Sequence, residues 1–252
     1  KLDGNGFVIL SDANRNVNRE YEISSETYSI SYELPGANLF RGLFTFSNET
    51  FNIKMRVPKD ISYSNEKGKI MVYIFNNEKE ALGSLNDIRI IGGNETNDIS
   101  GPKITFESTS GKILNEGDHF YINENIIIKL SDPMGINITN EIGHEIVITN
   151  LETNSNENIT NKFYYDLNSI TNGSIIYQAE LNEKIHIHIK AWDNANNPSE
   201  KSIQLFRLED NKLRIFNSFN FPNPFQNSTQ FSFEITKSSS IKLDIFTLAG
   251  KK

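Results

Sequence analysis

Apolar and polar residues alternate along much of the chain, and this alternation predicts β-strands. The clearest case is Lys184–Trp192, where every second residue from Ile185 to Ala191 is apolar. Successive side chains of a strand point to opposite faces, so this segment has one apolar face that a second layer must cover. The same pattern predicts strands at Thr27–Leu34, Thr50–Val57, Lys69–Phe75, Thr229–Ile235 and Ser240–Phe246.

The residues between these segments favour turns, and the amino-acid composition as a whole favours strands. Asn, Gly, Asp and Ser interrupt the chain at the spacing of about 8–12 residues that is typical of sandwiches and barrels. Ile and Asn are abundant, whereas Ala and Leu, the best helix formers, are scarce. No long segment has the 3.6-residue apolar period of a helix. We therefore expect an all-β protein made of tandem, immunoglobulin-like β-sandwich domains, followed by an incomplete β-sandwich.

Two polar stretches predict boundaries between structural units. Ile91–Pro102 is rich in glycine and polar residues, and Leu208–Lys212 is a short charged connector. They divide the chain into a first unit (1–100), a middle unit (101–209) and a tail (210–252). The middle unit has the length of about 100 residues that an immunoglobulin-like sandwich needs. The tail is close to the size of about 40 residues below which a core rarely stands alone.

Both ends of the sequence are expected to be cuts in a longer polypeptide. Lys1–Gly4 has no apolar stretch of the kind found in a signal peptide. Thr247–Lys252 follows a predicted strand at the point where a hairpin turn is expected to begin.

Composition excludes several classes of function. The hydrophobic share of 37% is enough to fill a core, but no run approaches the roughly 18 apolar residues of a membrane helix. A net charge of -7 argues against a nucleic-acid surface, which needs a basic stripe. The chain has 0 cysteines, which excludes disulfides, a thiolate nucleophile and Cys-ligated metal within it.

Histidines give two weak candidates for metal binding. His144-Glu145 begins like the zincin motif, but Ile148 stands where the second His is required, and the segment is β-branched rather than helical. His186 and His188 share one face of the predicted strand, and nothing local supplies a further ligand. We expect a solvated face there and no zinc chemistry.

Two polar loops resemble calcium loops only in part. Asp12–Asn16 starts like one, but Val17 and Ile23 stand at its glycine and glutamate positions. Asp193–Pro198 is also rich in oxygen ligands. Because Asn and Asp tolerate tight turns, we interpret both as turns, and leave open whether either binds calcium.

Gly-x-Ser-x-Gly and phosphate-binding P-loop motifs are absent, and Glu116 and Asp118 have no matching carboxylate pair. We therefore expect no catalytic residue, metal or cofactor in this chain.

The tail opens with an aromatic, proline-rich segment, Phe219–Phe225. Pro222 and Pro224 cannot donate ladder hydrogen bonds, so we expect an extended lead-in rather than an interior strand. Its phenylalanines are expected to anchor it against a sheet; an ordinary aromatic-rich linker is the alternative. Phe221–Phe231 (FPNPFQNSTQF) and Leu243–Lys251 (LDIFTLAGK) resemble the C-terminal sorting domain of the type IX secretion system of Bacteroidetes. The closing hairpin of that domain is missing from this chain.

Segments upstream of the tail are similar, in order, to the sortase of the same secretion system. They are Leu39–Gly42, Phe51–Tyr63, Gly68–Ile70, Ile90–Gly93, Lys129–Asn137, Gly143–Glu145 and Lys190–Asp193. The sortase family consists of gingipain-like cysteine peptidases at the outer surface, which remove sorting domains from cargo and link the cargo to anionic lipopolysaccharide. Their catalytic Cys and His lie in a domain N-terminal to the region matched here, so no catalytic residue is carried over.

The resemblance implies a non-catalytic scaffold and anchor at the extracellular face of the outer membrane, reached by periplasmic export and type IX secretion. The family works in an attachment complex with an outer-membrane barrel protein, PorV, and retains its own sorting domain as an anchor. The expected partner-docking residues are Phe219, Phe221, Pro222, Asn223, Pro224 and Phe225. One alternative is a secreted cargo protein of this route, an adhesin or a glycan-binding module that uses Trp192 or exposed Tyr. Another is a hydrolase site within the chain.

Overall fold

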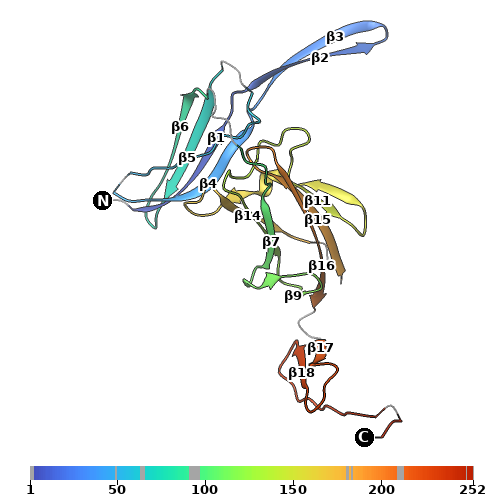
Figure 1. The fold of residues 1–252 in the computed structure, drawn as a ribbon. Helices are drawn as coiled ribbons and strands as arrows, with labels where there is room; N and C mark the ends of the chain where they lie inside the picture. The colour runs from blue at the N-terminus through green and yellow to red at the C-terminus, as the bar shows by residue number, and fades with distance from the viewer. Residues whose placement is uncertain are drawn as a thin grey trace.

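The computed structural model is nearly all β-structure and describes residues 3–48, 50–62, 66–90, 97–179, 182, 184–208, 213–247 and 249–251. The stretches 91–96 and 209–212, which carry the two predicted joints, lie outside the described residues, as do Tyr63 and Leu248. No helix in the described ranges is long and apolar enough to cross a membrane. The prediction of an all-β fold is confirmed, with several sheets in a sandwich-like arrangement (Figure 1).

Most strands belong to two sheets. The larger has nine strands in the order β6-β5-β1-β4-β13-β14-β10-β7-β8, and the smaller has five in the order β12-β11-β15-β16-β9. The strands of the nine-stranded sheet are β1 (Gly4–Ser11), β4 (Asn38–Phe46), β5 (Gly68–Phe75), β6 (Glu80–Ile88), β7 (Lys103–Ser108), β8 (Ile113–Leu114), β10 (Ile126–Ser131), β13 (Tyr164–Tyr165) and β14 (Asn172–Tyr177). The five-stranded sheet contains β9 (His119–Tyr121), β11 (Val147–Asn150), β12 (Ser155–Asn158), β15 (Lys184–Trp192) and β16 (Pro198–Leu208). One 3-10 turn, η1 (Thr160–Lys162), precedes β13.

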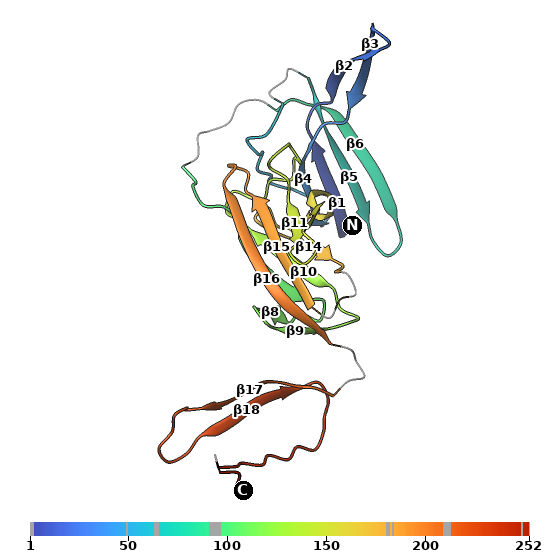
Figure 2. The ribbon, with the colours of Figure 1, turned by 90° about the vertical axis from the view of Figure 1, so that its right-hand side faces the viewer.

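The middle unit is a two-layer sandwich with an isoleucine-rich core. The predicted strand Lys184–Trp192 is β15, and its alternate residues from Ile185 to Ala191 are buried. They share one hydrophobic cluster with Ile126, Ile128 and other alternate residues of β10, which lies in the facing sheet (Figure 2). Burying such side chains contributes about 1.5–3 kcal/mol each, which offsets the cost of ordering the backbone.

The first and middle units share the nine-stranded sheet. β1, β4, β5 and β6 lie in the first unit, and β4 meets β13 of the middle unit in parallel through one residue pair, Gly42 and Tyr165. A Cβ on Gly42 would lie 3.0 Å from Cβ of Tyr165 and 2.9 Å from the Phe40 ring. Glycine is therefore the residue that fits this close approach. The division near residue 100 remains a prediction.

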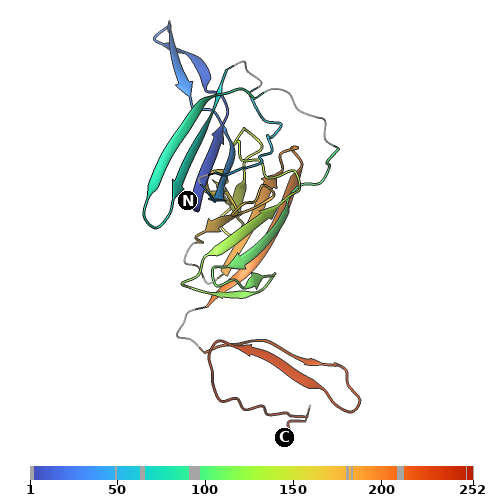
Figure 3. The same ribbon diagram turned by 90° about the vertical axis from the view of Figure 1, so that its left-hand side faces the viewer.

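A hairpin extends away from the rest of the described chain. It consists of β2 (Arg15–Ile23) and β3 (Glu26–Leu34), which form a separate two-stranded sheet (Figures 1 and 3). The predicted strand Thr27–Leu34 lies within β3. Its apolar side chains, Tyr28, Ile30, Tyr32 and Leu34, are exposed, so the alternation here marks a strand whose apolar face is left uncovered.

Two other predicted strands are not strands in the structure. Only Thr50 of Thr50–Val57 makes a bridge, with Ser47, and the rest runs across the sheet face with Ile53 and Met55 packed on the core. Its alternation serves that packing rather than a hydrogen-bonded ladder. Ser240–Phe246 also has no strand assignment, because no described strand lies alongside it to complete a ladder. The predicted strands Lys69–Phe75 and Thr229–Ile235 are confirmed as β5 and, from residue 230, β18 (Gln230–Ile235).

The tail contains a second separate hairpin, in which β17 (Ile215–Phe221) pairs with β18. The prediction that all of Phe219–Phe225 is an extended lead-in is wrong for its first three residues. Phe219, Asn220 and Phe221 pair with Ser232, Phe231 and Gln230. The proline-containing stretch that follows connects the two strands, where missing ladder donors cost nothing.

Candidate functional site

A polar junction centred on Asp60 joins the first unit to the middle unit. We call Asp60, Asn137, His144 and Asn196 the Asp60 junction. Oδ1 of Asp60 accepts a hydrogen bond from Nδ2 of Asn196 at 2.6 Å, and Oδ2 accepts one from Nδ2 of Asn137 at 2.7 Å. Nδ1 of His144 lies 2.5 Å from Oδ2 and donates, because an ionised carboxylate offers only acceptors. Three loops of the middle unit therefore converge on one carboxylate of the first unit.

Packing around the Asp60 junction fixes its members in place. Asn137 is fully buried, its main-chain N–H donates to the carbonyl of Trp192 at 2.9 Å, and its Oδ1 accepts from Thr139. The His144 ring lies 4.5 Å from the Trp192 ring, and the ammonium of Lys190 lies 5.1 Å from that same ring. Asp60 itself is brought in by its chain neighbours, since Lys59 N donates to the carbonyl of Asn194 and Pro58 is buried.

These contacts make the Asp60 junction costly to open. Only 12% of the Asp60 side chain is exposed, and all three of its partners come from the other unit. A buried polar group that loses its partners costs about 1–3 kcal/mol, and a charged one more. The arrangement therefore holds two units at a fixed relation. Asp60 and His144 also line a hollow of about 320 Å³, together with Asp12, Arg15, Ala37, Ile61, Ser62, Glu141 and Ile142.

Two further contacts support the same seam. Arg41 of β4 is buried, donates to the carbonyls of Phe163 and Thr160 at 2.9 and 3.0 Å, and lies over the Tyr164 ring. Burial lowers the pKa of this guanidinium. Asn168 has a positive φ of 57°, its main-chain N–H donates to the carbonyl of Leu43, and its Oδ1 accepts from Thr45 N. Both residues pair with main-chain groups of the opposite unit.

An acidic cluster lies close to the same loops. One carboxylate oxygen from each of Asp98, Asp132 and Asp193 lies within 4.8 Å of the others. Burial raises the pKa of Asp132 to about 6. The hydrogen bond from Met134 N opposes this shift, and the carboxylates of Asp193 and Asp98 add to it. Burial also raises the pKa of Asp193. These are oxygen ligands of the type that Ca²⁺ takes, and among the described residues they form a group that could hold a divalent cation.

The Asp193 carboxylate already has a structural role in this loop. Its Oδ1 accepts from the amides of Ala195 and Asn197, and its Oδ2 accepts from Nδ2 of Asn197. These bonds form a tight turn in which Asn196 has a φ of 68°. The interpretation of Asp193–Pro198 as a turn is confirmed. Asp12 similarly accepts from Ala13 N and Ser62 N at the link between β1 and β2.

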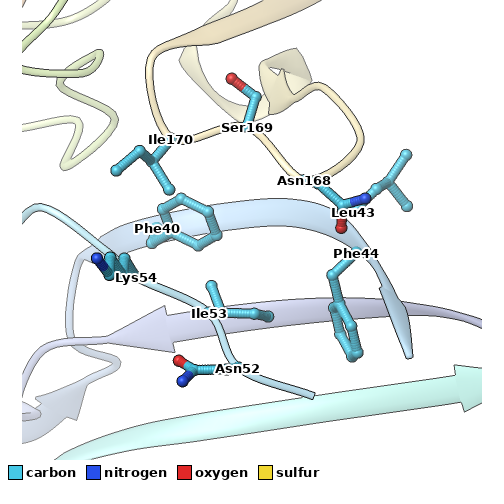
Figure 4. A pocket seen from close by; sticks show the side chains of 9 residues that line it. All are labelled: Phe40, Leu43, Phe44, Asn52, Ile53, Lys54, Asn168, Ser169 and Ile170. Atoms are coloured by element: carbon cyan, nitrogen blue, oxygen red, sulfur yellow. The ribbon is translucent and has the colours of Figure 1, made fainter. Parts of the chain in front are cut away.

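A small cavity of about 320 Å³ opens at the seam between the units (Figure 4). Its walls come from β4, from the segment that crosses the sheet face, and from the loop before β14. The lining residues are Phe40, Leu43, Phe44, Asn52, Ile53, Lys54, Asn168, Ser169 and Ile170. This volume is at the lower end of the range of about 300–1,000 Å³ for ligand pockets, and no pair of acid and base lines it. Its lining mixes apolar side chains with the polar residues Asn52, Lys54, Asn168 and Ser169.

The remaining candidates from the sequence lie apart from the junction. His186 and His188 share one face of β15, as predicted; their ring nitrogens lie 3.8 and 3.5 Å from carboxylates of Glu152 and Glu200.

The six predicted docking residues of the tail are brought together by β17 and the connection after it. Their side chains are all exposed, and Phe221 is 72% exposed. Their docking role stays a prediction.

Sequence reasoning missed the role of Asp60, Asn137 and Asn196. All three lie in segments where the resemblance was found or in the adjacent turn, Phe51–Tyr63, Lys129–Asn137 and Asp193–Pro198. Their residue types, Asp and Asn, could have identified them as candidates, because short polar side chains between apolar runs are typical of buried turn and loop contacts. The contact between them could not be inferred from the sequence, because 77 positions separate Asp60 from Asn137.

Comparison with known proteins finds a similarity among solved structures. No protein-family model and no curated protein matches the sequence. Among solved structures, the chain is similar to the dimeric latent PorU of Porphyromonas gingivalis, with 23% sequence identity and a TM-score of 0.41. The match covers 94% of this chain but 23% of that one.

Proposed function

We propose that this chain is the non-catalytic scaffold and anchoring region of a PorU-like sortase of the type IX secretion system. The observation that carries the proposal is the Asp60 junction. Phe51–Tyr63, Lys129–Asn137, Gly143–Glu145 and Lys190–Asp193, four of the segments with sequence resemblance to that sortase, each supply a residue to the junction or to its packing. Shared sequence is thus concentrated where the two units are held together, which is what a spacer of fixed geometry needs.

The construction of the seam supports the proposed scaffold role. Units joined only by a linker move relative to one another by default. Here the Asp60 junction, Arg41 and Asn168 each add side-chain bonds across the seam, and β4 and β13 share a sheet. Such a body keeps the distance between its two ends constant. In a sortase it would hold the peptidase domain, which lies elsewhere in the parent protein, at a set distance from the membrane surface.

The anchoring role is assigned to the tail. Phe219, Phe221 and Phe225 expose 59%, 72% and 52% of their surface, which is unusual for such large apolar side chains. Both edges of the β17–β18 hairpin are free of pairing with other described strands. An open edge flanked by aromatic side chains suits strand addition to an outer-membrane barrel of the PorV kind. Under this proposal, the parent protein lies at the extracellular face of the outer membrane.

Deletion of residues 219–252 from the intact parent protein tests the anchoring role. We expect the shortened protein to be released into the medium while its peptidase activity on a soluble peptide is unchanged. Phe221→Ala with Phe225→Ala is expected to lower retention in part, whereas Lys237→Ala, at an exposed position of the same tail, is the matched control. Retention on cells equal to that of the parent would rule out anchoring by the tail.

A further inference from the structure

The outer edge of β6 is an unusually long free strand edge. β6 ends the nine-stranded sheet, and no described strand pairs with its outer side. It has nine residues, whereas β8 at the opposite end has two. Its residues 80–87 are all exposed, with Leu82 at 70% and Leu85 at 56%. Natural proteins usually protect such edges with proline, lysine or a covering segment, and the β6 strand itself contains neither residue.

The register shows which groups of β6 face outward. Asn76 N donates to the carbonyl of Lys79 at 2.9 Å, so these two residues form a hydrogen-bonded pair. Hydrogen-bonded and non-hydrogen-bonded pairs alternate in an antiparallel ladder. Ala81, Gly83 and Leu85 therefore bond to β5, and the N–H and C=O groups of Glu80, Leu82 and Ser84 point away from the sheet. A further strand can pair there without disturbing β5.

An apolar groove runs beside this edge. Two adjoining hollows of about 320 and 240 Å³ share Phe51, Ile74 and Ala81 as lining residues. Ile70, Val72 and Leu85 extend the apolar wall along one end, and Lys79 lines the other end. The side chains of Ala81, Gly83 and Leu85 lie on the groove side of the sheet together with their partners on β5.

Gly83 leaves a gap in the middle of this wall. A Cβ built on Gly83 would meet no atom within 4 Å, so the space beside it is open. A large aromatic side chain on a neighbouring strand can cover such a glycine, and this cross-strand arrangement stabilises sheets. An occupant is therefore favoured if it places an aromatic residue opposite Gly83, an apolar one opposite Ala81, and an acidic one opposite Lys79.

We propose that the outer edge of β6 and its groove bind an extended peptide strand of a partner protein by antiparallel strand addition. The chemistry of that strand is an alternating sequence with an aromatic residue opposite Gly83 and a carboxylate at its C-terminal end. Main-chain hydrogen bonds to Glu80, Leu82 and Ser84 supply affinity, and the groove selects the side chains. This inference does not depend on the sortase proposal, because it concerns a different edge from that of the tail.

Fluorescence anisotropy with a labelled Val-Thr-Phe-Thr-Val-Thr-Glu peptide, capped at both ends, tests the proposal on the full chain. We expect saturable binding in the micromolar range. Ser84→Pro removes an outward N–H and should weaken binding by about tenfold or more, whereas Ser84→Ala keeps that N–H and should bind as the parent chain does. Replacing the C-terminal Glu of the peptide with Lys should weaken binding severalfold.

A second variant covers the case in which Ser84→Pro does not fold. Gly83→Val fills the gap, so it should weaken binding of the Phe peptide more than binding of a peptide with Ala in place of Phe. Absence of saturable binding, or equal binding by Ser84→Pro in a folded protein, overturns the proposal. So does a dimer, detected by light scattering, that pairs through β6 and is not dispersed by the peptide.

Discussion

Nδ1 of His144 lies 2.5 Å from Oδ2 of Asp60, although the two residues are 84 positions apart in the sequence. The histidine belongs to the middle unit and the aspartate to a segment that crosses the first unit. The contact therefore ties together parts of the chain that local sequence cannot connect. Asn137 and Asn196 saturate the same carboxylate, which makes Asp60 the residue on which the seam depends most.

Asp60→Ala should destabilise the chain strongly. It leaves His144, Asn137 and Asn196 without their common acceptor, and we expect the free energy of unfolding to fall by about 2–4 kcal/mol. In a chain of this size, each kcal/mol lost lowers Tm by roughly 2–4 °C, and the Tm of the variant is measured by calorimetry. Lys59→Ala, at the exposed neighbouring position, should change Tm little. Equal Tm values for the two variants would contradict the assigned role of Asp60.

Arg41→Lys should weaken the seam despite keeping the positive charge. The guanidinium reaches two carbonyls at once through Nε and one terminal nitrogen, and a single ammonium cannot reproduce that fork. We expect a loss of about 1–3 kcal/mol in denaturant unfolding. Arg19→Lys, on the exposed hairpin, serves as the control. An Arg41→Lys variant as stable as the control would show that the two carbonyl contacts contribute nothing.

Asp132 should make stability depend on pH in the direction opposite to an ordinary carboxylate. Its pKa rises from 3.8 to about 6 on folding, so the folded state binds the proton more tightly than the unfolded chain. Stability from this group is therefore full below about pH 4 and is lost as pH rises through about 6.

Asp132→Asn keeps the acceptor for Met134 N and removes the charge. Its Tm should match that of the parent near pH 4 and exceed it by about 2–5 °C at pH 7.5. Asp87→Asn, an exposed carboxylate, is the control for a general effect of net charge. A parent-to-variant difference in Tm that stays constant between pH 4 and pH 7.5 would exclude Asp132 as its source.

Phe216→Ala should release the imidazole of His119. That ring is stacked between Phe206 of β16 and Phe216 of β17, with centroids 5.4 and 4.3 Å away. Burial, with a smaller contribution from Lys112, lowers the pKa of His119. Removing Phe216 exposes the ring, so the pKa should rise toward its ordinary value in an NMR titration. Phe219→Ala, at a position 59% exposed, should leave the pKa of His119 where it is.

The alternation of apolar and polar residues predicted strands correctly where partner strands lie beside the segment. Lys184–Trp192 and Lys69–Phe75 are flanked on both sides by other strands, and both became β15 and β5 as expected. Thr50–Val57 and Ser240–Phe246 have the same alternation without a neighbouring strand to complete a ladder. Period two reports which side chains share a face; whether a ladder forms depends on contacts far along the chain.

The Asp60 junction was beyond prediction for the same reason. Asn137 and His144 could be marked as residues of shared motifs, but their common acceptor belongs to another unit. The turn at Asp193 was predictable, because a short polar side chain bonded to its own loop is a local event. Groups that act across a seam need the relative position of two sheets, which no single segment encodes.

The lone pairing of Gly42 with Tyr165 has a mechanical consequence. Along the nine-stranded sheet, pulling force passes from strand to strand through rows of main-chain bonds, except where β4 meets β13 in one residue pair. Tension between the two ends of the molecule would therefore concentrate at that step and be borne mainly by the side chains of Asp60, Arg41 and Asn168. Under load, the first rupture is expected there, with each sheet half still intact.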